Sequence, residues 1–99
     1  MPNQLIYIMV EVGNPMHAAC HIWSNGRWML PNTSHDDLLS VEKERPDEVK
    51  YLGDISEIDH PVIAKTVTRW QSFVYELTEE AYKACTEKWE ARRLASSDP

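Results

Sequence analysis

The dipeptide Asn25-Gly26, set between the apolar runs His17–Ser24 and Arg27–Leu30, constrains this chain more than any other feature. A two-residue type I′ turn needs a positive φ at both central positions, and Asn-Gly is the pair that tolerates this best. Such a turn fixes the register of an antiparallel hairpin and sets Trp23 opposite Trp28. An aromatic cross-strand pair stabilises a hairpin by about 0.5–1 kcal/mol. The sequence therefore predicts a hairpin over residues 17–30.

A third strand is expected at residues 5–12, which are rich in β-branched side chains and end at Gly13-Asn14-Pro15. Alternation along strands gives the predicted meander, residues 1–33, two different faces. One face is aliphatic and carries Ile6, Ile8, Val10, Val12, Ile22 and Met29. The other is rich in aromatic side chains and carries Tyr7, Met9, Trp23, Trp28 and Leu30.

The connecting segment, residues 34–60, carries the whole net charge of −6. Nine acidic residues there face three basic ones, whereas the flanking segments are each neutral. Ser34 and Asp37 have the spacing of a capping box, which predicts a short helix over residues 35–44 that ends before Pro46. Residues 49–55 are expected to form a fourth strand. An acidic surface suits a basic partner, and the acids expected to contact one are Asp36, Asp37, Glu42, Glu44, Asp47 and Glu48.

Residues 61–96 have apolar side chains at steps of three and four, which predicts one long amphipathic helix followed by a tail at residues 97–99. The stripe consists of Ile63, Val67, Trp70, Val74, Leu77, Ala81 and Cys85. An alternative is a break at Thr78, which could cap a second helix. A helix of about 54 Å would overhang a domain of this size, and its outward residues Phe73, Tyr82 and Trp89 would allow a homodimer.

The expected fold is therefore α+β: a single domain, residues 1–99, with a three- to four-stranded antiparallel sheet packed by a long C-terminal helix. The core would join the aliphatic face of the sheet to the first five stripe residues, Ile63 to Leu77. The aromatic face would stay open as a contact surface, because large exposed apolar patches usually have a partner. The alternative is that the aromatic side chains are core and that residues 35–55 cover the aliphatic face.

The candidate ligands for metal chemistry are His17, Cys20 and His21. Zinc needs three or four nitrogen or sulfur ligands, and on a strand Cys20 points away from the two histidines. Neither Cys20 nor Cys85 has a recognised spacing to a histidine for nucleophilic catalysis. We therefore expect no metal, no cofactor and no enzymatic activity. A small enzyme or metal-dependent protein is the alternative.

The net charge of −6 disfavours direct nucleic-acid binding, although Lys65/Arg69 and Lys88/Arg92 leave it open as an alternative. No apolar run approaches the roughly 20 residues that span a bilayer, so no membrane association is expected. The two cysteines do not form a disulfide scaffold, and we expect free thiols and a cytoplasmic location.

By elimination, the sequence predicts a small acidic binding protein that occupies a protein or ribonucleoprotein partner with a basic surface. In size, acidity and lack of catalytic groups it resembles phage- or plasmid-encoded inhibitors of host defence, such as anti-CRISPR and anti-restriction proteins. The resemblance is one of general character and rests on no shared motif. A homo-oligomeric structural module is the remaining alternative.

Overall fold

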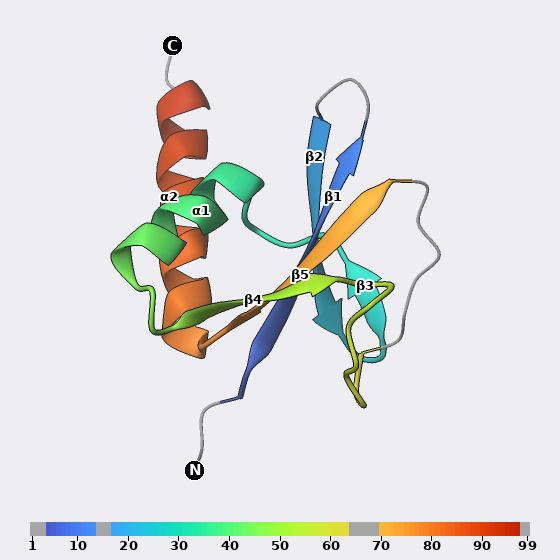
Figure 1. The fold of residues 1–99 in the computed structure, drawn as a ribbon. Coiled ribbons are helices and arrows are strands. Elements are labelled where there is room, and N and C mark those ends of the chain that lie inside the picture. Colours follow the sequence, from blue (N-terminus) through green and yellow to red (C-terminus); the bar gives the residue numbers. More distant parts are fainter. Residues whose placement is uncertain (1–3, 14–16, 64–69, 98–99) are drawn as a thin grey trace.

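A computed structural model describes residues 4–13, 17–63 and 70–97, which form an antiparallel sheet with two helices (Figure 1). In chain order the elements are β1 (Ile6–Gly13), β2 (His17–Ser24), β3 (Arg27–Met29), α1 (His35–Glu44), β4 (Val49–Asp54), β5 (Gln71–Leu77) and α2 (Glu79–Ser97). The strand order is β3-β2-β1-β5-β4. The α+β class and the C-terminal helix are confirmed, and the sheet gains β5, a strand that the sequence did not predict.

The predicted hairpin is confirmed in its turn and in its register. Asn25 and Gly26 have φ values of 53° and 80°, and Trp23 pairs with Trp28 across β2 and β3. The two indole rings meet edge to face, with centroids 5.1 Å apart, a geometry that aromatic pairs prefer.

The short helix α1 is confirmed with the predicted bounds. Ser34 caps it, because its hydroxyl oxygen accepts the backbone N–H of Asp37 at 3.3 Å. That hydroxyl also donates to the Asp37 carboxylate at 2.7 Å. The predicted strand that follows is confirmed as β4.

The prediction of one long helix over residues 61–96 is wrong. Residues 71–77 form β5, which pairs with β1 on one side and β4 on the other, and α2 begins at Glu79. A central strand is buried on both faces, so a strand of only seven residues can place apolar side chains at the same sequence steps of three and four as an amphipathic helix. The β-branched and aromatic side chains of Phe73-Val74-Tyr75 favour a strand.

The alternative break at Thr78 is confirmed at the start of α2. The Thr78 hydroxyl oxygen accepts the N–H of Ala81 at 3.1 Å and donates to the Glu48 carboxylate at 3.0 Å. This residue therefore caps α2 and links its start to Glu48, the residue before β4.

Both faces of the sheet are covered, one by the helices and the other by residues 55–63 after β4 (Figure 1). On the helix side the core consists of Ile8, Val10, Cys20, Leu38, Val41, Val49, Tyr75, Leu77, Ala81 and Cys85. On the opposite side it consists of Met9, Ile55, Ile58, Ile63 and Val74, with Tyr7, Trp23, Trp28 and Leu52 packed against it.

This two-sided arrangement corrects the expected core. Ile63 and Val74 are buried, but on the face opposite the helices, while Leu77 is buried on the helix side. Met29 and Trp70, also expected in the core, are partly exposed, and Val67 lies outside the described residues. Trp70 instead packs against Gly13, where a Cβ atom would lie 2.8 Å from the indole ring.

Candidate protein-interaction surface

Residues 55–63 have little regular structure, yet buried side chains anchor them to the sheet. Ile55, Ile58 and Ile63 point into the core on the Trp23–Trp28 side. The Ile55 N–H donates to the Ser72 carbonyl of β5 at 2.9 Å. These contacts join the segment to the sheet.

Two local turns shape the same segment. The Asp54 carboxylate accepts the backbone N–H of Ser56 at 2.8 Å and its hydroxyl at 2.6 Å, and these bonds hold the pKa of Asp54 below its ordinary value. His60 Nδ1 accepts the N–H groups of Val62 and Ile63, each at 3.2 Å. The His60 ring meets Tyr7 edge on, with centroids 4.7 Å apart.

The outer side of this segment combines acidic and apolar side chains. Glu57 and Asp59 flank the buried Ile58 and are both exposed. Val62 is 63% exposed, and Leu30, two residues after Trp28, is 84% exposed. We call Leu30, Glu57, Asp59 and Val62 the loop–hairpin surface; the half-buried Trp23–Trp28 pair belongs to the core beneath residues 55–63.

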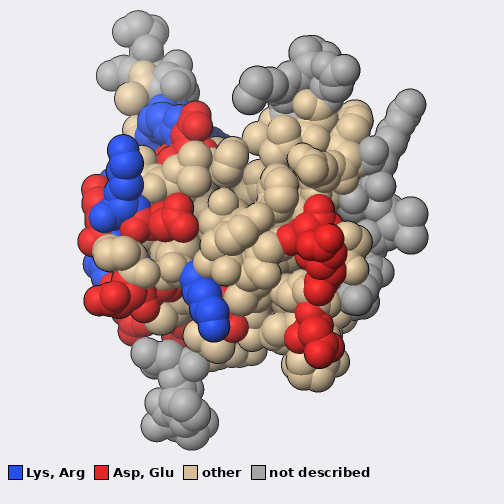
Figure 2. Space-filling view, in the orientation of Figure 1, with Lys and Arg blue, Asp and Glu red and all other residues tan. Residues whose placement is uncertain are grey.

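Acidic side chains gather over the segment after β4 in Figure 2. A broad, mostly uncharged area separates them from the mixed acidic and basic side chains over the helices. Among the described residues, the negative charge on the loop side is therefore less interspersed with positive charge than that on the helix side.

The structure changes the expected aromatic contact face. Met9 is buried, and Tyr7 is half-buried against His60. Trp23 and Trp28 pack against the isoleucines of residues 55–63. Of the five residues expected on an open face, only Leu30 is largely exposed. The sequence did not predict that residues 55–63 cover this face, because that segment has no periodic pattern.

The predicted acidic contact residues lie elsewhere, around α1 and the start of β4. Most are paired within the chain: Arg92 with Asp36 and the buried Asp37, Lys88 with Glu44, and Arg45 with Glu48. Glu42 is half-buried on α1, and Asp47 is exposed before β4. The structure thus does not bring these six acids together with the tryptophans, and their contact with a partner stays a prediction.

The acids that do accompany the tryptophans are Glu57 and Asp59, which sequence reasoning placed in the charged segment but not in the site. The available signal was their alternation with Ile58 between two further isoleucines. That pattern indicates an irregular segment with one buried and one charged side.

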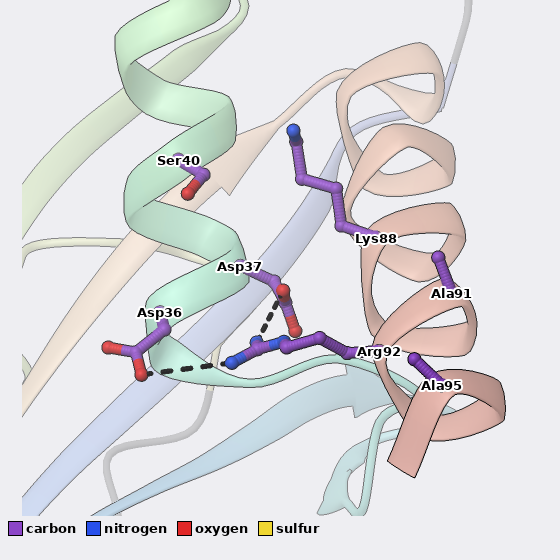
Figure 3. A pocket seen from close by; sticks show the side chains of 7 residues that line it. All are labelled: Asp36, Asp37, Ser40, Lys88, Ala91, Arg92 and Ala95. Carbon is purple, nitrogen blue, oxygen red and sulfur yellow. Dashed lines mark ion pairs between the residues drawn. The ribbon is translucent and has the colours of Figure 1, made fainter. Parts of the chain in front are cut away.

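A groove of about 450 Å³ lies between α1 and α2 (Figure 3). Small side chains and the Arg92 ion pairs line it, the full set being Asp36, Asp37, Ser40, Lys88, Ala91, Arg92 and Ala95. In Figure 3 the Arg92 side chain reaches across the groove to both aspartates. Because these charges balance one another, the groove offers no excess charge to hold an ionic ligand.

The cysteines are buried free thiols in the helix-side core. Burial raises the pKa of Cys20 to about 12 and that of Cys85 to about 11. Both thiols are therefore protonated at neutral pH, and the thiolate is the nucleophilic form.

Within residues 4–13, 17–63 and 70–97, no three His, Cys, Asp or Glu side chains come together in a way that could hold a metal ion. Neither helix in the described part of the chain has the length and apolar character needed to cross a bilayer. No protein-family model, curated protein or solved structure matches the chain.

Proposed function

We propose that this protein is a non-enzymatic binding protein that occupies a basic surface of a protein or ribonucleoprotein partner through its loop–hairpin surface. The observation that carries the proposal is the exposure of Val62 in the same segment as the exposed acids Glu57 and Asp59, together with that of Leu30, which follows the Trp28 that packs against this segment. Apolar side chains near acids that form no ion pair with another described residue suit the anchors and the polar rim of an interface.

The two kinds of side chain have different roles in this proposal. Buried apolar anchors slow dissociation, and a few such residues supply most of the binding energy. Acidic side chains speed association with a basic surface and select against acidic partners. The Trp23–Trp28 pair supports the anchors by fixing the backbone that presents Leu30.

Occupying a surface needs no catalytic group, so the protein would act by excluding other molecules from its partner. This is the mode of action expected of an inhibitor or modulator. A homodimer through an overhanging helix has less support, since Phe73 lies on β5, and Tyr82 and Trp89 are half-buried on α2.

Site-specific photo-crosslinking in cells that produce the protein tests the proposal. A benzophenone amino acid is placed at Leu30 or Val62, and at Leu94, an exposed position on α2, as the control. We expect one heterologous adduct from positions 30 and 62 and none from position 94. An adduct from position 94 alone would move the interface to the helices, and self-adducts alone would favour a homo-oligomer.

A further inference from the structure

One ring nitrogen of His60 holds the end of the segment that covers the sheet. The Nδ1 atom of His60 accepts the backbone N–H groups of Val62 and Ile63, each at 3.2 Å. In the described part of the chain, no other acceptor engages these two N–H groups. The half-buried imidazole meets the ring of Tyr7 on β1 edge to face, with centroids 4.7 Å apart and an interplanar angle of 71°. The turn at residues 60–63 therefore depends on a free lone pair on Nδ1.

The two residues that this turn holds lie in opposite environments. Val62 is 63% exposed and belongs to the loop–hairpin surface, whereas Ile63 is 5% exposed and packs in the core against the sheet. The Val62 N–H is exposed and can bind water when it loses the imidazole, but the Ile63 N–H is partly buried. An unpaired N–H away from water costs free energy. Loss of the Nδ1 acceptor therefore destabilises this turn and the position of Val62.

The protonation state of the imidazole decides whether Nδ1 accepts. A neutral imidazole has one N–H group and one acceptor nitrogen, whereas an imidazolium has an N–H group on both nitrogens. A protonated Nδ1 donates and cannot accept the N–H of Val62 or Ile63. Histidine is the side chain that ordinarily changes its charge between about pH 5 and 8. A modest fall in pH therefore removes the acceptor on which the turn depends.

Among the described residues, the charged groups around the imidazole do not oppose its protonation. Its own segment contributes the exposed acids Glu57 and Asp59. The facing strand β1 contributes Tyr7, whose hydroxyl has a pKa raised by burial and by the charge and hydrogen bond of Glu76, so it stays neutral in this pH range. Glu76 lies opposite Tyr7 on β5, and Lys50 lies opposite Glu76 on β4. Three carboxylates and one ammonium group make a positive imidazole electrostatically favourable.

We propose that His60 is a pH switch for the loop–hairpin surface: a proton on Nδ1 opens the turn at residues 60–63 and releases Val62. The consequence for binding rests on the proposed function, in which Val62 is an apolar anchor. At neutral pH the turn positions this anchor before the partner arrives. At mildly acidic pH the anchor must be ordered on binding, and that ordering costs binding free energy. The partner is therefore held more tightly at neutral pH.

The switch itself is tested on the free protein by NMR, without any partner. The ring nitrogens of His60 and the backbone amides of Val62 and Ile63 are recorded as the pH falls from about 7.5 to about 5. We expect an unprotonated Nδ1 at the higher pH. Hydrogen-exchange protection at Ile63 should fall by at least about fivefold, with the midpoint of the His60 titration. A proton on Nδ1 at neutral pH, or unchanged protection at Ile63 throughout, would overturn the proposal.

Three variants locate the titrating group. His60→Asn places an amide oxygen at the branch position that Nδ1 occupies, and this acceptor does not titrate, so protection at Ile63 should persist at both ends of the pH range. His60→Ala should lack it at both, at a temperature where thermal melts show the variant folded. His35→Asn removes a histidine at the start of α1 and should leave the response unchanged. A response in His60→Asn as large as that of the wild type would overturn the proposal.

The dissociation rate of the partner captured at position 30 tests the consequence for binding. Between pH about 7.5 and about 5.5 it should rise by at least about threefold for the wild type and less for His60→Asn. Equal rises would contradict control of the surface by His60. A failure of the cross-linking would leave the NMR result standing, and a failure of the NMR test would leave the proposed surface standing.

Discussion

Asp37 of α1 and Arg92 of α2 form an ion pair that spans the groove between the two helices, and the Asp37 side chain is only 5% exposed. Asp37, which the sequence marks as a candidate contact with a partner, therefore has a structural role within the chain. The same Arg92 donates to Ser34, the residue that caps α1, at 2.8 Å. The acidic segment is thus divided between helix-side acids that are mostly paired and the acids of the loop–hairpin surface.

Replacing Asp37 should destabilise the protein, and replacing Asp36 should not. Asp37→Asn weakens the network that joins the buried Asp37 carboxylate to Ser34 and Arg92, and we expect a loss of about 1–3 kcal/mol in the free energy of unfolding. Asp36→Asn removes the same charge from an 84% exposed side chain 3.9 Å from Arg92, which should cost less than about 0.5 kcal/mol. Urea denaturation measures both, and equal losses would contradict a structural role for Asp37.

The cap at Thr78 gives a second prediction. Thr78→Ala removes the acceptor for the Ala81 N–H and the bond to Glu48, and we expect a loss of about 1–2 kcal/mol in the free energy of unfolding. Thr78→Ser keeps the hydroxyl and should retain most of that stability. If the Thr78→Ser and Thr78→Ala variants unfold at the same midpoint concentration of denaturant, the hydroxyl does not cap α2.

Alkaline pH should destabilise the fold in part through Cys20. Burial raises the pKa of this thiol from 9.0 to about 12, so the folded state favours the protonated form. The resulting stability is complete below pH about 9 and is lost as the pH rises towards about 12. Melting temperatures between pH 8 and 11, taken under reducing conditions, should fall less steeply for Cys20→Ala than for the wild type.

Some decline remains in that variant, because burial raises the pKa of Tyr75 in the same direction. Cys20→Ala also lowers stability at every pH through the smaller side chain, so the slope is the quantity compared. Parallel curves for the two proteins would mean that the thiol is not protected from ionisation.

Two hairpin residues should differ in their effect on stability, because Trp28 packs in the core and Leu30 is exposed. Trp28→Ala removes a ring packed against Trp23 and residues 55–63, and we expect a loss of about 3 kcal/mol or more in the free energy of unfolding. Leu30→Ala changes an 84% exposed side chain and should stay within about 0.5 kcal/mol of the wild type. A large loss of stability in Leu30→Ala would mean that this side chain belongs to the core.

Local signals made much of the fold predictable. The Asn25-Gly26 turn and the Ser34 cap depend on neighbours in the sequence, and both appear as predicted. Phe73 to Leu77 escaped prediction because a short strand buried on both faces satisfies a helical pattern as well. The cover over Trp23 and Trp28 was missed because turns at Asp54 and His60, without any periodicity, bring its isoleucines to the sheet.

Charge pairing was beyond sequence reasoning for a different reason. Asp37 and Arg92 meet only because both helices pack on one face of the sheet, and Lys88 meets Glu44 in the same way. The sequence could therefore count the acids of residues 34–60. It could not separate those that form an ion pair from Glu57 and Asp59, which form none with another described residue.

The central claim is that Glu57 and Asp59 direct the loop–hairpin surface to a basic partner. Its most direct test is the association rate with the partner captured at position 30, measured against ionic strength. Glu57→Gln/Asp59→Asn should slow association by at least about threefold at low salt and flatten the salt dependence. Glu87→Gln/Glu90→Gln removes the same net charge from exposed positions on α2 and should retain most of the wild-type rate. Equal slowing in both double variants, or none in the first, would contradict the account.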